Sequence, residues 1–322
     1  MPREFLDWRK HRLPYPTSLT IDIHSHCNAR CKICPYPTLK DTLPMGFMEE
    51  ALFHRLIDEF AELKRQQHIR GHVIFCNMGE LFLDPQVLDK IAYVRDRGLE
   101  LIIQTNAALM TPDKTDALVE MGYASPTYIS FHGITPEVYR NIMGLPYEKA
   151  LSHTRYAIEK LPDVKIRSFS YQYPLGEARK VLRFWQSVKP GLNVKLHVPN
   201  SRTGLLPHLA RTPLKYPGPW LAGCKKGLPL RDMVVAFNGQ AVLCCEDMGR
   251  HGVLGDVSQS SLVDVWNSQR AHKIMDYLYG GGWGERDSKF LCRRCEFGLS
   301  TQFRRLVKNV DHNWQMLTKA TF

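Results

Sequence analysis

The chain has 322 residues, of which 44% are hydrophobic and 23% charged, the composition of an ordinary globular protein with material for a sizeable core. Its first residues carry charges where a signal peptide needs an apolar segment, and no apolar run approaches the ~18 residues that span a bilayer. We therefore expect a cytoplasmic protein with no membrane partner. The net charge of +11 favours anionic partners, although the basic residues are scattered and form no long block.

Strand-like and helix-like segments alternate over the first two hundred residues. The strands are predicted from their Val, Ile, Thr, Phe and Tyr content at 18–23, 72–77, 100–106, 127–132, 165–173 and 193–199. The helices are predicted at 48–67, 84–97, 111–121, 135–143, 148–161 and 176–188. Six such alternations indicate a mainly parallel sheet with right-handed crossovers, which fits a full or partial β/α barrel. The active site of such a barrel lies at the carboxyl ends of its strands.

The pattern changes at about residue 205. Several prolines interrupt the chain, and Asn238-Gly239 then divides two short strand-like runs over 234–243, a strong signal for a tight hairpin. A helix is expected over 261–278, followed by a glycine run. The predicted fold class is therefore α/β, with a partial (β/α)6 barrel over 1–205 and a small β-hairpin-plus-helix domain over 206–322.

Nine cysteines in a chain without an export signal favour metal or redox chemistry over structural disulfides. Cys27, Cys31 and Cys34 place three thiolates on one loop just after the first strand. Three ligands leave one iron of a [4Fe–4S] cluster free to bind another molecule. A structural zinc site normally uses four ligands, so the group fits zinc poorly.

The Cys-x3-Cys-x2-Cys spacing resembles the signature of the radical S-adenosylmethionine (SAM) family, with Ile33 where an aromatic residue is common. Segments at the ends of the next strands are also similar to that family. Met78-Gly79-Glu80 resembles its Gly-Gly-Glu segment, which binds the amino group of SAM, although Met78 replaces the first glycine. The remaining SAM contacts that the resemblance implies are Thr105, Asn106, Ser130 and Arg140.

The resemblance also implies a mechanism. The free iron chelates SAM, an electron from the cluster cleaves SAM, and the resulting 5′-deoxyadenosyl radical removes a hydrogen atom from an unactivated C–H bond. An external donor such as flavodoxin or ferredoxin would supply the electron. The protein must position the substrate and exclude water and competing hydrogen donors.

A second cysteine group lies in the C-terminal part of the chain and consists of Cys224, Cys244, Cys292 and Cys295. Together with the hairpin, it resembles the twitch domain, a shortened SPASM domain that holds one auxiliary [4Fe–4S] cluster with complete cysteine ligation. Four thiolates also suit zinc, which stays an alternative. A fully ligated cluster would transfer electrons or support the structure.

Cys245 adjoins the predicted ligand Cys244, and strand neighbours point to opposite faces. Cys245 is therefore a candidate catalytic residue that returns a hydrogen atom to a substrate radical, the alternative being an inert buried thiol. Cys76 is expected to pack in the core. The other polar candidates for SAM or substrate contacts are Asp22, His24, His26, Arg167, Tyr171, Asn200, Arg202, Glu246 and Asp247.

The overall layout resembles the aminoglycoside- and aminocyclitol-modifying epimerases and dehydrogenases of the radical SAM family. The extra thiol favours C–H epimerisation of a small, sugar-like, hydroxylated substrate that is polar or anionic. The first alternative is a dehydrogenase that oxidises a secondary alcohol through the auxiliary cluster. A ribosomal-peptide maturase is disfavoured because Cys27 leaves no room for an N-terminal leader-binding domain. A zinc-stabilised nucleic-acid-binding protein is disfavoured by the SAM-site segments, so nucleic acid is not an expected partner.

Overall fold

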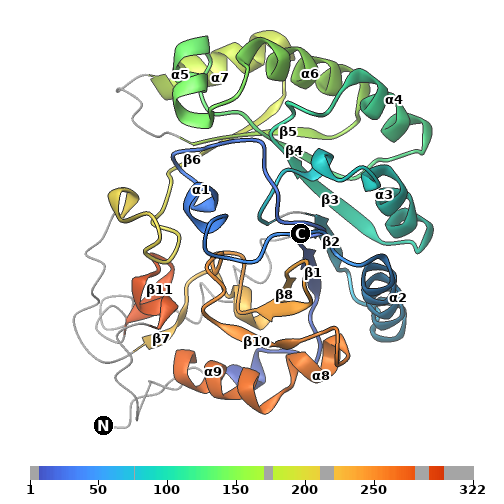
Figure 1. Ribbon diagram of the computed structural model, residues 1–322, viewed down its shortest axis with the longest axis vertical. Coiled ribbons are helices and arrows are strands. Elements are labelled where there is room, and N and C mark those ends of the chain that lie inside the picture. The colour runs from blue at the N-terminus through green and yellow to red at the C-terminus, as the bar shows by residue number, and fades with distance from the viewer. Residues whose placement is uncertain (1–6, 76, 170–176, 211–220, 280–289, 301–322) are drawn as a thin grey trace.

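The computed structural model describes residues 7–75, 77–169, 177–210, 221–279 and 290–300. Among these residues the strands form a nine-stranded sheet in the order β10-β9-β8-β1-β2-β3-β4-β5-β6 and a two-stranded sheet of β11 and β7. Figure 1 shows the large sheet curving through the molecule, with helices along its outer side. Cys76 and Tyr171, singled out in the sequence, lie outside the described residues.

Six parallel strands confirm the predicted barrel strands. Each pairs with the next strand in the chain. Their bounds are β1 (Ser18–Ile21), β2 (His72–Phe75), β3 (Glu100–Thr105), β4 (Thr127–Ser130), β5 (Val164–Phe169) and β6 (Asn193–His197).

The predicted helices are also present and alternate with these strands. They are α2 (Glu50–Gln67), α3 (Val87–Asp96), α4 (Pro112–Glu120), α5 (Pro136–Met143), α6 (Tyr147–Lys160) and α7 (Glu177–Val188), and a short α1 (Tyr36–Leu39) follows the first cysteine group. Helix α4 shows why such boundaries are readable. Thr111 accepts a hydrogen bond from the Lys114 backbone N–H through its Oγ1, and Pro112 occupies the first helical position.

The two faces of the parallel strands differ in burial. Residues such as Val73, Phe75 and Ile129 are fully buried in the main core. The alternating positions, including Gln104, Tyr128 and Arg167, are only partly buried. We call this second side the inner face, and it leads towards the strand ends at which a β/α barrel builds its site.

The C-terminal part continues the same sheet. Strand β8 (Asp232–Val235) pairs in parallel with β1, and β9 (Gln240–Val242) and β10 (Val253–Asp256) extend the sheet antiparallel. The hairpin between β8 and β9 turns at Gly239, whose φ of +85° lies in the left-handed region. The division at residue 205 stays a prediction, since the sheet runs across it.

The single helix expected over 261–278 is wrong. The structure has α8 (Leu262–Trp266) and α9 (Gln269–Tyr279) instead. The break falls where Asn267 Nδ2 donates to the Pro14 carbonyl at 2.7 Å and Ser268 Oγ accepts from the Ala271 N–H. The sequence also missed the short sheet formed by β7 (Leu221–Cys224) and β11 (Gly298–Ser300).

None of the helices in the described residues has both the length and the apolar character needed to cross a membrane. A cytoplasmic location stays a prediction.

Candidate metal centres

The first cysteine group lies on the loop that leaves β1. Burial is the main cause that raises the pKa of Cys31, and the charges of Cys34 and Cys27 raise it further. The three thiols are therefore close enough for their charges to interact. Three thiolates forced together in a buried position repel one another, and a bound iron cluster would relieve that repulsion. The donor set therefore fits a cluster with one iron left open.

Backbone hydrogen bonds hold this loop in place. The N–H groups of Arg30 and Lys32 donate to the carbonyls of Met143 and Ile142 at 3.0 and 2.9 Å, at the end of α5. The Cys27 N–H donates to Tyr36 Oη at 3.0 Å. The loop is thus shaped by neighbouring elements as well as by any metal.

Met78-Gly79-Glu80 passes directly against the same loop. The Glu80 N–H donates to the His26 carbonyl at 2.9 Å. Gly79 has a φ of +111°, and a Cβ there would lie 2.9 Å from the same carbonyl oxygen. Glycine is therefore required at position 79 by both backbone conformation and space.

The carboxylate of Glu80 is buried and fully engaged with the protein. It accepts from Thr105 Oγ1 at 2.5 Å, from the Asn106 N–H at 2.7 Å and from the Phe82 N–H at 3.3 Å. Burial raises the pKa of Glu80, although these donors oppose the rise. The predicted SAM residues on β2 and β3 are thus brought together, and the Glu80 side chain locks the ends of those two strands. Their contact with SAM stays a prediction.

Two nearby polar residues complete this arrangement. Asn106 Nδ2 donates to the side-chain oxygen of Asn28 at 2.8 Å, which links β3 to the cysteine loop. Asp22 Oδ1 accepts from the N–H groups of Asn77 and Met78 at 2.7 and 2.8 Å, and burial raises the pKa of Asp22 to about 6. The sequence analysis missed Asn28, and its only signal was a polar residue inside the cysteine loop.

The structure separates the last two predicted SAM contacts. Ser130 ends β4 and is the register partner of Arg167 on the inner face. Arg140 lies on α5 with an exposed side chain that forms an ion pair with Glu148 at 2.9 Å. Contact between SAM and either Ser130 or Arg140 stays a prediction.

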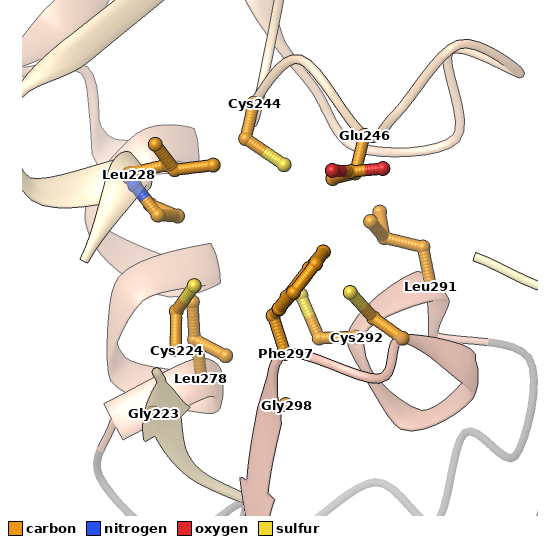
Figure 2. A pocket seen from close by; sticks show the side chains of 12 residues that line it. Gly223, Cys224, Leu228, Cys244, Glu246, Leu278, Leu291, Cys292, Phe297 and Gly298 are labelled. Atoms are coloured by element: carbon orange, nitrogen blue, oxygen red, sulfur yellow. The ribbon is translucent and has the colours of Figure 1, made fainter. Parts of the chain in front are cut away.

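The second cysteine group surrounds a pocket between elements that are distant in sequence. Cys224 ends β7, Cys244 follows β9, and Cys292 and Cys295 belong to the 3₁₀ helix η5 (Leu291–Arg294) and the residue after it. Figure 2 shows the labelled thiols of Cys224, Cys244 and Cys292 around this pocket, with Leu228, Leu278, Leu291 and Phe297 as its apolar lining. After burial, charges from Cys245, Cys292 and Cys224 raise the pKa of Cys244.

This spacing bears on the choice between iron–sulfur and zinc. Among the described residues, no three His, Cys, Asp or Glu side chains converge closely enough to hold a single metal ion. The four thiols instead stand around an apolar pocket. Four thiolates around one pocket suit an iron–sulfur cluster and also a single zinc ion.

Cys245 differs from its two neighbours in its relation to that pocket. It is absent from the pocket lining, whereas its neighbours Cys244 and Glu246 belong to it. Burial and the charge of Glu246 raise the pKa of Cys245 to about 12, and Arg202 opposes the rise. Burial lowers the pKa of Arg167, and the charge of Cys245 is among the effects that oppose it. Because Arg167 lies on the inner face of β5, the thiol of Cys245 is close to that face.

The segment after Cys245 connects the two cysteine sites. Glu246 is buried and pairs with Arg202 at 2.9 Å and with Lys226 at 3.5 Å. Burial lowers the pKa of Arg202, but Glu246, Cys34 and Cys245 outweigh it and raise that pKa. Met248 packs against Tyr36 and Met78 beside the first loop. The sequence analysis missed Lys226 and Met248, for which nothing in local sequence was diagnostic.

Comparisons with known proteins agree with this geometry. A model of the radical SAM superfamily matches residues 21–176, and a model described as an iron-sulfur cluster-binding domain, SPASM, matches residues 224–296. A tungsten-containing aldehyde ferredoxin oxidoreductase cofactor-modifying protein of Pyrococcus furiosus is 33% identical over 107 residues, 32% of this chain and 28% of the relative. An S-adenosyl-L-methionine-dependent 2-deoxy-scyllo-inosamine dehydrogenase of Niallia circulans is 21% identical over 86% of this chain and 91% of its own.

Solved structures share the fold over nearly the whole chain. BtrN in complex with AdoMet and 2-DOIA has a TM-score of 0.56 at 18% identity, covering 92% of this chain and 94% of BtrN. Native anSMEcpe with bound AdoMet has a TM-score of 0.62 at 15% identity, covering 94% and 98%. Streptococcus suis SuiB bound to its precursor peptide SuiA has a TM-score of 0.61 at 16% identity, covering 90% and 72%.

Proposed function

Because this chain belongs to the radical SAM superfamily and carries a SPASM-type auxiliary domain, we propose that it removes a hydrogen atom from a small hydroxylated molecule and inverts that carbon through Cys245. The observation that carries this proposal is the position of Cys245, which lies outside the auxiliary pocket and beside the inner face of the barrel. The zinc-stabilised nucleic-acid-binding alternative is set aside by the two domain matches.

The two domains imply SAM, a SAM-binding [4Fe–4S] cluster and an auxiliary iron–sulfur cluster. Cys27, Cys31 and Cys34 would hold the first cluster, and Cys224, Cys244, Cys292 and Cys295 the second. When bound together, the first cluster and SAM supply a radical that takes hydrogen from carbon. Met78 and Gly79 would offer backbone groups to SAM, while Glu80, Thr105 and Asn106 keep the strand ends in place.

Cys245 supplies the second half of the reaction. A cysteine thiol is ordinarily protonated near neutral pH. It can give its hydrogen atom to the substrate radical, which forms a C–H bond of opposite configuration and leaves a sulfur radical. One electron and one proton from solvent then restore the thiol. An external donor, or the cluster that the second cysteine group would hold, could supply the electron.

Dehydrogenation is a second candidate. The 2-deoxy-scyllo-inosamine dehydrogenase aligns with this chain over most of both sequences. In this reaction the substrate radical would lose a proton from its hydroxyl group and one electron, which leaves a ketone. The cluster that the second cysteine group would hold could accept that electron. Cys245 would then be dispensable. Solved structures of SuiB and anSMEcpe contain bound peptides. A peptide is therefore also a substrate to test.

One experiment in deuterated water separates these reactions. We would incubate the reconstituted enzyme, SAM and a reductant with 2-deoxy-scyllo-inosamine and with neutral, amino and acidic hexoses, and analyse products by mass spectrometry and NMR. Epimerisation gives a product one mass unit heavier, because the exchangeable thiol hydrogen becomes deuterium. Dehydrogenation gives a product two mass units lighter.

The Cys245→Ala variant is the matched test. We expect it to cleave SAM at a rate near that of the wild type but to yield no inverted product. Cys245→Ser keeps a side chain of nearly the same shape but replaces the thiol by a hydroxyl, which does not readily donate a hydrogen atom, and it should behave in the same way. An unchanged yield of inverted product in both variants would remove Cys245 from the mechanism, and a ketone product would replace epimerisation with dehydrogenation.

A further inference from the structure

Basic side chains gather on the inner face beside Cys245. Arg167 on β5 and Lys195 on β6 are register partners, as are Phe169 and His197 two residues further along each strand. After burial, the charges of Arg167, Lys195 and Lys226 are what lower the pKa of His197. Arg167, Lys195, Lys226 and His197 therefore share one electrostatic environment on and beside the last two barrel strands.

Arg167 is held rigidly but is not neutralised. Its Nη1 donates to Gln104 Oε1 at 2.7 Å, and its guanidinium carbon lies 3.8 Å from the centre of the Tyr128 ring. Within the part of the chain that the structure describes, its buried Nε has no hydrogen-bond partner. Among the described residues no carboxylate forms an ion pair with Arg167, and burial lowers its pKa. A fixed, partly desolvated guanidinium with an unused donor is suited to bind an anion.

The nearby carboxylate does not balance this charge. Glu246 is shared by Arg202 and Lys226. Arg202 also lies near the thiols of Cys34 and Cys245, so its positive charge interacts with those cysteines as well as with Glu246. Arg167 and Lys195 remain as excess positive charge on the inner face.

We propose that this basic group, with Arg167 as its main contact, binds a phosphate or carboxylate group of the substrate and thereby holds the reacting carbon near Cys245. This inference rests on the proposed function, because it assigns the charge of the molecule that the same site transforms. A protonated amine would be repelled here, so the substrate would differ in charge from 2-deoxy-scyllo-inosamine, the amine named for a relative.

The test compares four hexoses of one shape and different charge: glucose, glucosamine, glucuronate and glucose 6-phosphate. Their dissociation constants would be measured by calorimetry on the reconstituted enzyme with SAM bound and no reductant, so that no turnover is needed. We expect at least one anionic sugar to bind about tenfold or more tightly than glucose, and glucosamine to bind most weakly. The two acids distinguish a phosphate site from a carboxylate site.

Variants then assign the effect to Arg167. Arg167→Gln should reduce anion binding to about the level of glucose and leave SAM binding unchanged, while Arg167→Lys should retain part of the anion preference. Arg179→Gln, which removes a charge from an exposed position on α7, is the control and should change nothing. If Arg167→Gln does not hold its clusters, Lys195→Gln provides a second variant and should weaken anion binding about threefold.

The failures of the two proposals differ. Anion binding without any SAM cleavage or hydrogen exchange would overturn the proposed function and leave this inference standing. Three results would overturn this inference and leave the proposed function standing. Glucosamine could bind as tightly as the acidic sugars, or no sugar in the series could show a preference for an anion. The third result is a loss of SAM affinity in Arg167→Gln.

Discussion

The two cysteine sites are built in different ways. The first has its three cysteines within eight residues, on a loop fixed by backbone bonds to α5 and to the Gly79 segment. The second draws cysteines from β7, from the end of β9 and from η5, which come together only in the folded chain. The described bonds between β7 and β11 form a sheet of just two short strands.

This difference separates the roles that metal would have at each site. The first loop is shaped by the barrel, so a cluster there adds chemistry to an existing structure. The second site closes long segments of chain around an apolar pocket, so binding of a cluster there contributes directly to folding. The comparison predicts that the two sites respond differently when their ligands are removed.

The largest expected effect follows from removing paired ligands. Cys292→Ala with Cys295→Ala should lose about four irons and lower the Tm by roughly 10 °C, since a structural metal site supplies several kcal/mol of folding free energy. Cys31→Ala with Cys34→Ala should also lose about four irons, but the Tm should fall by only a few degrees. Iron, sulfide and zinc analysis with calorimetry measures both.

Equal losses of Tm in these two double variants would break the comparison. A wild-type protein with about four irons and one zinc would instead assign the second site to zinc. The zinc result would also remove the auxiliary electron acceptor or reductant from the proposed chemistry.

The same contrast explains what the sequence could predict. Cys27, Cys31 and Cys34 are readable because their spacing is local, and the barrel strands are readable because each is a short apolar run between helix signals. The link between Arg202 and Glu246 spans 44 positions, and nothing local indicates it. The surface ion pair of Arg140 with Glu148 was not predicted for a related reason, because sequence position after a strand does not tell which side of α5 a residue occupies.

An intermediate effect tests whether the fold shapes the first site. Gly79→Ala should lower stability by about 1–3 kcal/mol and weaken SAM binding, because alanine at a φ of +111° is strained and its Cβ would meet the His26 carbonyl. Gly98→Ala is the matched control, since Gly98 has a φ of +67° with nothing within 4 Å of the added Cβ. It should cost about 1 kcal/mol and leave SAM binding unchanged. Similar SAM affinities in the two variants would show that the Gly79 segment does not shape the site.

The smallest expected effect concerns the charges between the sites. Burial raises the pKa of the Cys34 thiol, and the charge of Arg202 acts against that rise. Arg202 also pairs with Glu246, which lines the pocket of the second cysteine group. Arg202→Gln removes one positive charge beside the first cluster and should make its reduction potential more negative. The shift should be on the order of 50–100 mV, from the Coulomb energy of a unit charge at an effective dielectric constant of about 20.

Lys226→Gln is the comparison variant, because Lys226 pairs with the same carboxylate but, unlike Arg202, is not among the charges that act on Cys34. A redox titration followed by electron paramagnetic resonance should show the first cluster shifted only by Arg202→Gln. Equal shifts in both variants would mean that Glu246 transmits charge to the first cluster. The two cysteine sites would then be coupled through one carboxylate. The first site, whose loop the barrel holds in place, and the second site, which its metal holds together, could no longer be treated as independent.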